Sequence, residues 1–260
     1  MTEDDNMLTF GGHLEVLRKM LFRTFAVAGT IALVVFFLKE TTFTLLLAPS
    51  EYDFCTYRWI ENAIKLSGRE FHFEQYHVEL IATDLSSQFM THITTSCYLG
   101  LLGASPFIVY ELFKFISPAL YESERKNSVF IVTGIYTLFI IGVLMSYFIL
   151  FPISFRFLGT YSVSERVHST ITLDSYIETF TTLTLIMGII FQLPIITFML
   201  SKIGLINSYM LSQYRKHAFL IIMIVAAIIT PPDLMTLALV TIPLYFLYEV
   251  SIRIVGWVEA

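Results

Sequence analysis

Long stretches without a charged residue alternate along the chain with short polar segments. Such apolar runs predict membrane-spanning helices, because about 20 mainly apolar residues cross the hydrocarbon core and a helix satisfies its own backbone polar groups there. We place six spans at about residues 20–38, 85–112, 128–155, 179–201, 215–231 and 234–250. The pattern therefore predicts an all-α integral membrane protein, with residues 1–260 as a single transmembrane domain and both termini on one side.

The last two spans are shorter than the others. The turn Thr230-Pro231-Pro232-Asp233 separates them, and two consecutive prolines cannot continue a helix. About 15 apolar residues at about 1.5 Å each cover roughly 23 Å, against about 30 Å of hydrocarbon. We therefore expect a tight hairpin of short spans, or helices that run on into interfacial residues such as Tyr214 and Ile252.

The longest connection, residues 39–84, follows the first span. Polar and apolar residues alternate in REFHFEQYHVEL, residues 69–80, and this alternation predicts a short strand or a folded cap. We expect residues 39–84 to form a cap on the outer side of the membrane.

Basic residues set the orientation. Ten of the 16 Lys and Arg residues lie on the side of the termini and six on the opposite side. Because loops rich in Lys and Arg stay in the cytoplasm, both termini are predicted to be cytoplasmic. The segment before the first span is acidic and no small-residue cleavage site follows that span, so we interpret it as a retained helix.

Composition supports a membrane protein. Hydrophobic residues make up 56% of the chain and charged residues 14%, whereas soluble domains average about 25% charged residues. The net charge of −5 gives no reason to expect a nucleic-acid partner. Cys55 and Cys97 suggest neither a disulfide framework nor a metal site, and no cofactor motif is present.

Some polar residues need an explanation. Gln192 lies near the middle of the fourth span, two residues before Pro194, and an amide there requires a partner. That partner is either another helix of this chain or a separate membrane helix, and the residues alone leave both open. Glu111 and Lys114, spaced i,i+3, are interpreted as an ordinary surface pair. By composition, residues 122–126 form a solvated loop.

Two alternative classes lack their expected residues. A secondary transporter or channel would carry several ionisable groups at mid-membrane, and only Gln192 approaches this description. A membrane enzyme would need a nucleophile or a metal set, and no such motif is evident.

Several segments, in order and over nearly the whole chain, resemble one family. They are GGHLEVLRKML at 11–21, LLLAPS at 45–50, IATDLSSQF at 81–89, ASPFIVYELFKFISPALYESERK at 104–126, IIFQLPI at 189–195 and AAIITPPDLMTLALVTIPLYFLYEV at 226–250. The chain resembles TatC, the multi-spanning subunit of the twin-arginine protein translocase.

This resemblance implies a receptor, not an enzyme. TatC-like proteins recognise signal peptides with an Arg-Arg pair and form the core of a machine that exports folded proteins, driven by the proton-motive force. The resemblance also implies a curved, glove-like array of six helices in the bacterial cytoplasmic membrane. The implied partners are single-span TatA-like and TatB-like proteins, and self-association within the complex is expected.

The resemblance also assigns residues. Its signal-peptide site falls on Glu124, Glu15, Arg18, Phe115 and Pro118. The glutamate of the family's H-L-x-E-L-R motif falls on Val16, and the neighbouring Glu15 is rotated by about 100° on a helix. Gln192 matches a polar position that we expect to contact a partner helix. Four further residues match the family pattern: Pro49, Asp84, Asp233 and Glu249.

Overall fold

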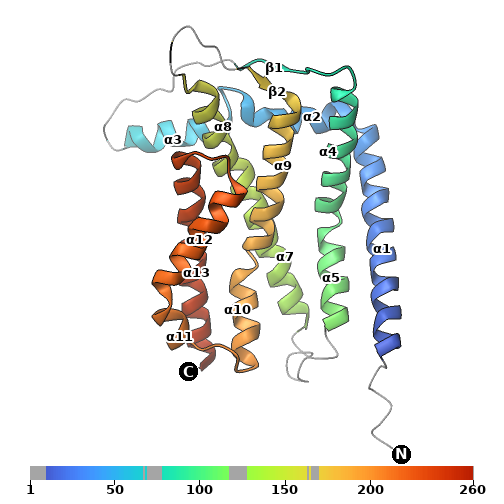
Figure 1. The fold of residues 1–260 in the computed structure, drawn as a ribbon, viewed down its shortest axis with the longest axis vertical. Coiled ribbons are helices and arrows are strands. Elements are labelled where there is room, and N and C mark those ends of the chain that lie inside the picture. The colour runs from blue at the N-terminus through green and yellow to red at the C-terminus, as the bar shows by residue number, and fades with distance from the viewer. Residues whose placement is uncertain are drawn as a thin grey trace, which may run out of the picture. The chain divides into compact units, whose positions relative to one another are not determined.

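The structure is a computed structural model that describes residues 10–66, 68, 78–116, 128–162, 164 and 170–259. Glu124, Pro118 and most of the segment expected to form a strand lie outside the described residues. The chain divides into two compact units, Met1–Lys39 with Ile93–Tyr136, and Glu40–His92 with Thr137–Ala260. Each unit is built mainly from helices (Figure 1).

The first unit is organised around helix α1, Phe10–Phe37. It packs against α5, Ser105–Ile116, and against the end of α4, Ser87–Gly103. A Cβ atom added to Gly100 of α4 would lie 2.6 Å from Cβ of Ala32 and 2.7 Å from the carbonyl oxygen of Ala28. Two small residues four positions apart on α1 therefore let the helix backbones approach closely, as is common between membrane helices.

The expected second span is bent. Helices α4 and α5 meet at an angle of 50°, with the break at Ala104. Pro106, at the start of α5, has no backbone N–H to continue the ladder of α4, and this accounts for the break.

The second unit contains the expected fourth span and the part of the third span that follows Tyr136. Helix α7, Ser128–Met145, continues through a π-helical segment, η4, Ser146–Leu150, into α8, Phe151–Thr160. The fourth span consists of α9, Leu173–Ile190, and α10, Leu193–Lys202. A Cβ atom added to Gly142 of α7 would lie 2.6 Å from the carbonyl oxygen of Met187 of α9, so this glycine permits a close helix crossing.

The expected outer cap, residues 39–84, is helical over its first described part, residues 39–66. It contains α2, Lys39–Leu47, the 3-10 helix η2, Ala48–Ser50, and α3, Cys55–Leu66. The Tyr57 hydroxyl donates to the carbonyl of Pro152 at 2.8 Å, and the Tyr176 hydroxyl donates to the carbonyl of Leu46 at 2.8 Å. These bonds hold the cap on α8 and α9. Pro49, one of the family-matched residues, is buried in η2.

The end of the cap contributes one strand of a short parallel pair. Strand β1, Leu80–Ile81, pairs with β2, Ile171–Thr172. After β1, the backbone carbonyl of the exposed Asp84 accepts from the Ser87 amide at 3.1 Å, which starts α4. The hydroxyls of Ser87 and Thr91 donate to the carboxylate of Asp174, in the first turn of α9. Asp174 thus links the start of α9 to the start of α4, where Ser87 and Thr91 lie 87 and 83 residues earlier in the sequence.

The carboxy-terminal hairpin has a short first half and a long second half. It comprises α11, Ser208–Gln213, α12, Arg215–Ile229, and α13, Leu234–Glu259 (Figure 1). Helix α12 has 15 residues, as a short span requires, whereas α13 has 26 and runs on past Ile252, which is the second alternative that the sequence left open. The apolar window ended at Glu249, whereas Ser251, Ile252 and Val255 are still buried and extend the packed face of α13.

Among the residues that the structure describes, four helical segments are long and apolar enough to cross a membrane, or five if the bent pair is one span. They are Leu14–Phe37, Val132–Thr160, Leu173–Lys202 and Leu234–Glu259, with Ser87–Gly103 and Ser105–Leu112 as the bent pair. Only 6% of the most apolar window of Leu14–Phe37 is buried within the chain, so α1 presents most of its apolar surface outward.

Candidate functional site

A cleft of about 150 Å³ lies between the first half of α1 and the end of α5. Its floor contains Glu111, which is 6% exposed, and Met20, which is 7% exposed. Its lining residues are Val16, Lys19, Met20, Arg23, Glu111, Lys114 and Phe115. The two helices thus bring together residues that are about 90 positions apart in sequence.

Glu111 is not half of a surface pair. Nη1 of Arg23 lies 3.2 Å from Oε1 of Glu111, and the side chains are 51% and 8% exposed respectively. The expectation of an ordinary Glu111–Lys114 surface pair is therefore wrong. Spacing within one helix suggested that pair, but the packing of α5 against α1 buries Glu111 and supplies Arg23 from the other helix.

A second hollow, of about 370 Å³, lies on a different part of α1. Leu14, Glu15, Arg18 and Lys19 line it. Nζ of Lys19 lies 2.7 Å from Oε1 of Glu15, and both side chains are more than 60% exposed. Val16 faces the cleft beside α5, so Glu15 and Val16 line different hollows, as their 100° separation on the helix requires.

The structure places three of the five predicted signal-peptide residues. Glu15 and Arg18 line the second hollow, and Phe115 lines the cleft. Lys19 lines both hollows, so these three residues lie around adjoining surfaces of α1 and α5. Glu124 and Pro118 lie outside the described residues.

Gln192 lies where the fourth span breaks. Its backbone N–H donates to the carbonyl of Ile189 at 3.0 Å, and its side-chain Nε2 donates to the carbonyl of Gly188 at 3.3 Å. Pro194, at the start of α10, prevents a continuous ladder across the break. The side chain of Gln192 thus bonds a carbonyl of its own span, four residues earlier, which leaves open both partners considered from the sequence.

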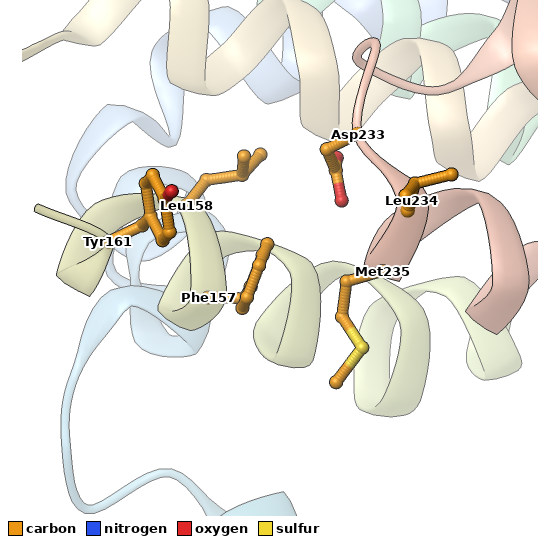
Figure 2. A pocket seen from close by; sticks show the side chains of 6 residues that line it. All are labelled: Phe157, Leu158, Tyr161, Asp233, Leu234 and Met235. Carbon is orange, nitrogen blue, oxygen red and sulfur yellow. The ribbon is translucent and has the colours of Figure 1, made fainter. Parts of the chain in front are cut away.

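Asp233 begins α13 beside a hollow of about 580 Å³. Figure 2 shows its side chain at the edge of this hollow, across from Phe157 and Tyr161 of the α8 region. Its Oδ1 accepts from the Thr236 backbone amide at 2.7 Å, which caps the helix. Within the described part of the chain, its buried Oδ2 has no hydrogen-bond partner.

Glu249 joins the two long helices of the hairpin. Nε of Arg215 lies 2.9 Å from Oε1 of Glu249, and Nη2 of Arg215 donates to Oε2 at 3.1 Å. The Tyr245 hydroxyl donates to the same carboxylate at 3.1 Å. A forked pair of this kind fixes the start of α12 against α13. The sequence matched Glu249 to the family but did not predict Arg215 as its partner.

These features define a multi-spanning integral membrane protein. Residues 12–243 match the family described as Sec-independent protein translocase protein (TatC). The chain is 37% identical to the TatC protein of Blattabacterium sp. subsp. Periplaneta americana (strain BPLAN), over 100% of this chain and 99% of that protein. It is 35% identical to TatCy of Bacillus subtilis (strain 168), over 70% of this chain and 71% of that protein.

Solved structures agree with this match. The structure described as the twin arginine translocase receptor TatC aligns with a TM-score of 0.75 and 29% sequence identity, covering 95% of this chain and 100% of that chain. The chain belongs to the TatC family. Its relatives are named as translocase proteins rather than enzymes.

Proposed function

We propose that this protein is the signal-peptide receptor and core subunit of a twin-arginine translocase, which exports folded proteins with energy from the proton-motive force. The observation that carries the proposal is the family match over residues 12–243, with a receptor structure that aligns over 95% of the chain. The protein works in a complex with other components of the translocase. We assign the single-span TatA-like and TatB-like proteins as those components, and include self-association.

The same proposal covers topology. Six spans form a glove-like array in the bacterial cytoplasmic membrane, with both termini in the cytoplasm. The fifth span corresponds to α12, whose 15 residues make it shorter than the others. The excess of Lys and Arg at one set of helix ends supports this orientation.

The signal-peptide site uses carboxylates at the cytoplasmic helix ends. Each arginine of a twin-arginine ligand presents a planar, permanently charged fork of donors that suits a carboxylate. We assign Glu124 as the main acceptor, with Pro118 and Phe115 shaping the loop around it. Glu15 and Arg18 extend the site along α1.

Glu15 is available for this role at small cost. Its pair with Lys19 is exposed on both sides, and solvent screens such a pair so that it contributes little to stability. An incoming guanidinium can therefore displace Lys19. Val16 carries no charge, so any carboxylate that the α1 motif offers to the ligand comes from Glu15.

Glu124→Gln tests the proposal, because it retains the size of the side chain and removes its charge. Truncating one member of a desolvated charge pair costs about 2–5 kcal/mol, or roughly 30-fold to several-thousand-fold in affinity. We expect Glu124→Gln to lose binding of an Arg-Arg peptide in a pull-down or anisotropy titration, with an unchanged amount of folded protein.

Glu122→Gln is the matched control on the same loop and should bind nearly as well as the parent. A large loss in Glu15→Gln would show that Glu15 substitutes for the acid absent at Val16. If Glu124→Gln binds the Arg-Arg peptide as tightly as the parent, the assignment of this loop as the receptor site is wrong.

We also propose that Gln192 contacts a partner membrane helix. Gln192 is partly exposed at the break between α9 and α10, so a helix outside the chain can approach the residue, although its Oε1 atom is buried. An amide that already bonds Gly188 can still donate its second hydrogen across a helix interface.

A further inference from the structure

The cleft between α1 and α5 has an excess of positive charge. Three cations line it, Lys19, Arg23 and Lys114, and one carboxylate, Glu111, so the lining carries a net charge of +2. Glu111 is engaged by Arg23. The lining therefore repels a cationic ligand and favours an anionic one.

The two lysines are the accessible cations. Lys19 pairs only with the exposed Glu15, which lies outside the cleft. Within the described residues, Lys114 makes no ion pair, although it is in the last turn of α5 at the rim of the cleft. Both ammonium groups can thus turn toward a ligand without breaking a buried contact.

The size and surroundings of the cleft indicate the ligand class. The cleft is small and three of its seven lining residues are cations, which suits a compact anionic group such as a phosphodiester rather than an acyl chain. Helix α1, which forms one wall of the cleft, is long and apolar enough to cross a membrane, and only 6% of its most apolar window is buried. Lipid therefore surrounds the helix that lines the cleft.

We propose that this cleft binds the phosphate group of an anionic phospholipid. Lys19 and Lys114 hold the phosphate, Arg23 adds a donor, and the acyl chains lie along the apolar surface of α1. Basic pockets between membrane helices are known sites for such headgroups, and the cytoplasmic leaflet carries the anionic lipids. The placement of the cleft at the cytoplasmic leaflet rests on the proposed function, whereas the cleft and its positive charge are features of the structure.

The lipid would also affect the receptor site. Phe115 lines the cleft and belongs to the proposed signal-peptide site, yet a net charge of +2 opposes the approach of an Arg-Arg pair. A bound phosphodiester lowers that charge. A lipid bound in the cleft therefore makes it easier for an Arg-Arg pair to approach the receptor site. The cleft binds an anion, whereas the receptor site binds a cation.

Lipid titration of the purified full chain tests the proposal. The protein, stripped of lipid in a neutral detergent, is titrated with phosphatidylglycerol while its thermal midpoint is followed and bound lipid is counted by native mass spectrometry. Phosphatidylcholine and inorganic phosphate serve as separate arms. We expect phosphatidylglycerol to bind and to raise the midpoint, and the other two to do neither at the same concentration.

Variants then locate the site. Lys19→Gln with Lys114→Gln should weaken phosphatidylglycerol binding about thirtyfold, which corresponds to about 2 kcal/mol at 1.4 kcal/mol per tenfold. Lys19→Arg with Lys114→Arg keeps the charges and should retain binding, which separates charge from folding. The matched control, Lys202→Gln with Lys216→Gln, removes two lysines of the second unit and should bind like the parent.

Three outcomes would overturn the lipid site: an equal loss in the matched control, equal binding of phosphatidylcholine, or displacement of the lipid by inorganic phosphate. The first would indicate general surface charge, the second an apolar contact, and the third a site for free phosphate. Glu124→Gln should leave lipid binding unchanged. Failure of the receptor proposal is thereby distinguished from failure of this one.

Discussion

The Arg23–Glu111 pair should respond asymmetrically to the loss of its two members. The guanidinium is 51% exposed and the carboxylate only 8% exposed. Arg23→Gln leaves a buried carboxylate without its partner, whereas Glu111→Gln leaves a cation that can turn to water or to the interface. We therefore expect Arg23→Gln to be the more destabilising substitution.

The exposure of each side chain sets the magnitude. Breaking a buried pair by removing one partner costs about 3–5 kcal/mol, whereas an exposed pair contributes at most about 1 kcal/mol. Lys19 and Lys114 line the same cleft and partly compensate Glu111, so we expect a loss of about 2–3 kcal/mol for Arg23→Gln. For Glu111→Gln we expect about 1 kcal/mol.

Thermal unfolding in detergent, followed by circular dichroism, measures the difference. At about 2–4 °C per kcal/mol for a chain of this size, Arg23→Gln should unfold at least about 2 °C below Glu111→Gln. The double variant should be no less stable than Arg23→Gln alone, because no buried charge remains. Lys19→Gln, which breaks the exposed Glu15–Lys19 pair, is the control for a surface ion pair.

An equal or larger loss in Glu111→Gln would refute this reasoning. It would mean that the carboxylate is hydrated and that Arg23 is the member that depends on the pair. Burial of Glu111 by the packing of α5 against α1 would then not determine which substitution destabilises the protein more.

Three further predictions follow from the fold. Gly142→Leu should lower the thermal midpoint, because its Cβ would lie 2.6 Å from the Met187 carbonyl and overpacking costs about 1–3 kcal/mol; an unchanged midpoint would contradict the close crossing. In sealed cells an impermeant thiol reagent should label Cys55 and spare Cys97, and labelling of Cys55 only after lysis would invert the topology. Gln192→Leu should weaken crosslinking to a single-span partner without unfolding the chain, at about 0.6 kcal/mol for an average interhelical bond; unchanged crosslinking would leave Gln192 with its internal role.

The apolar pattern predicted where helices lie better than where they end or bend. A run of apolar residues is a local property, so the windows around residues 20–38 and 179–201 correspond to described helices. Helix α13 continues past Glu249 because Ser251 and Val255 pack against the rest of the unit, which no local window contains. The cap over residues 39–66 was expected to be folded, but its helices depend on contacts such as that of Tyr57 with Pro152.

The sequence by itself determined the class of the protein and the family-matched residues, because span length, charge bias and motifs can be read along one chain. It could not decide which charged residues meet. Spacing paired Glu111 with Lys114 on one helix, but helix packing buried Glu111 and gave it Arg23, 88 positions away. Likewise, Glu249 found Arg215 across the hairpin. The energy of an ion pair depends on burial and on partners from other helices, and these exist only once the helices have packed.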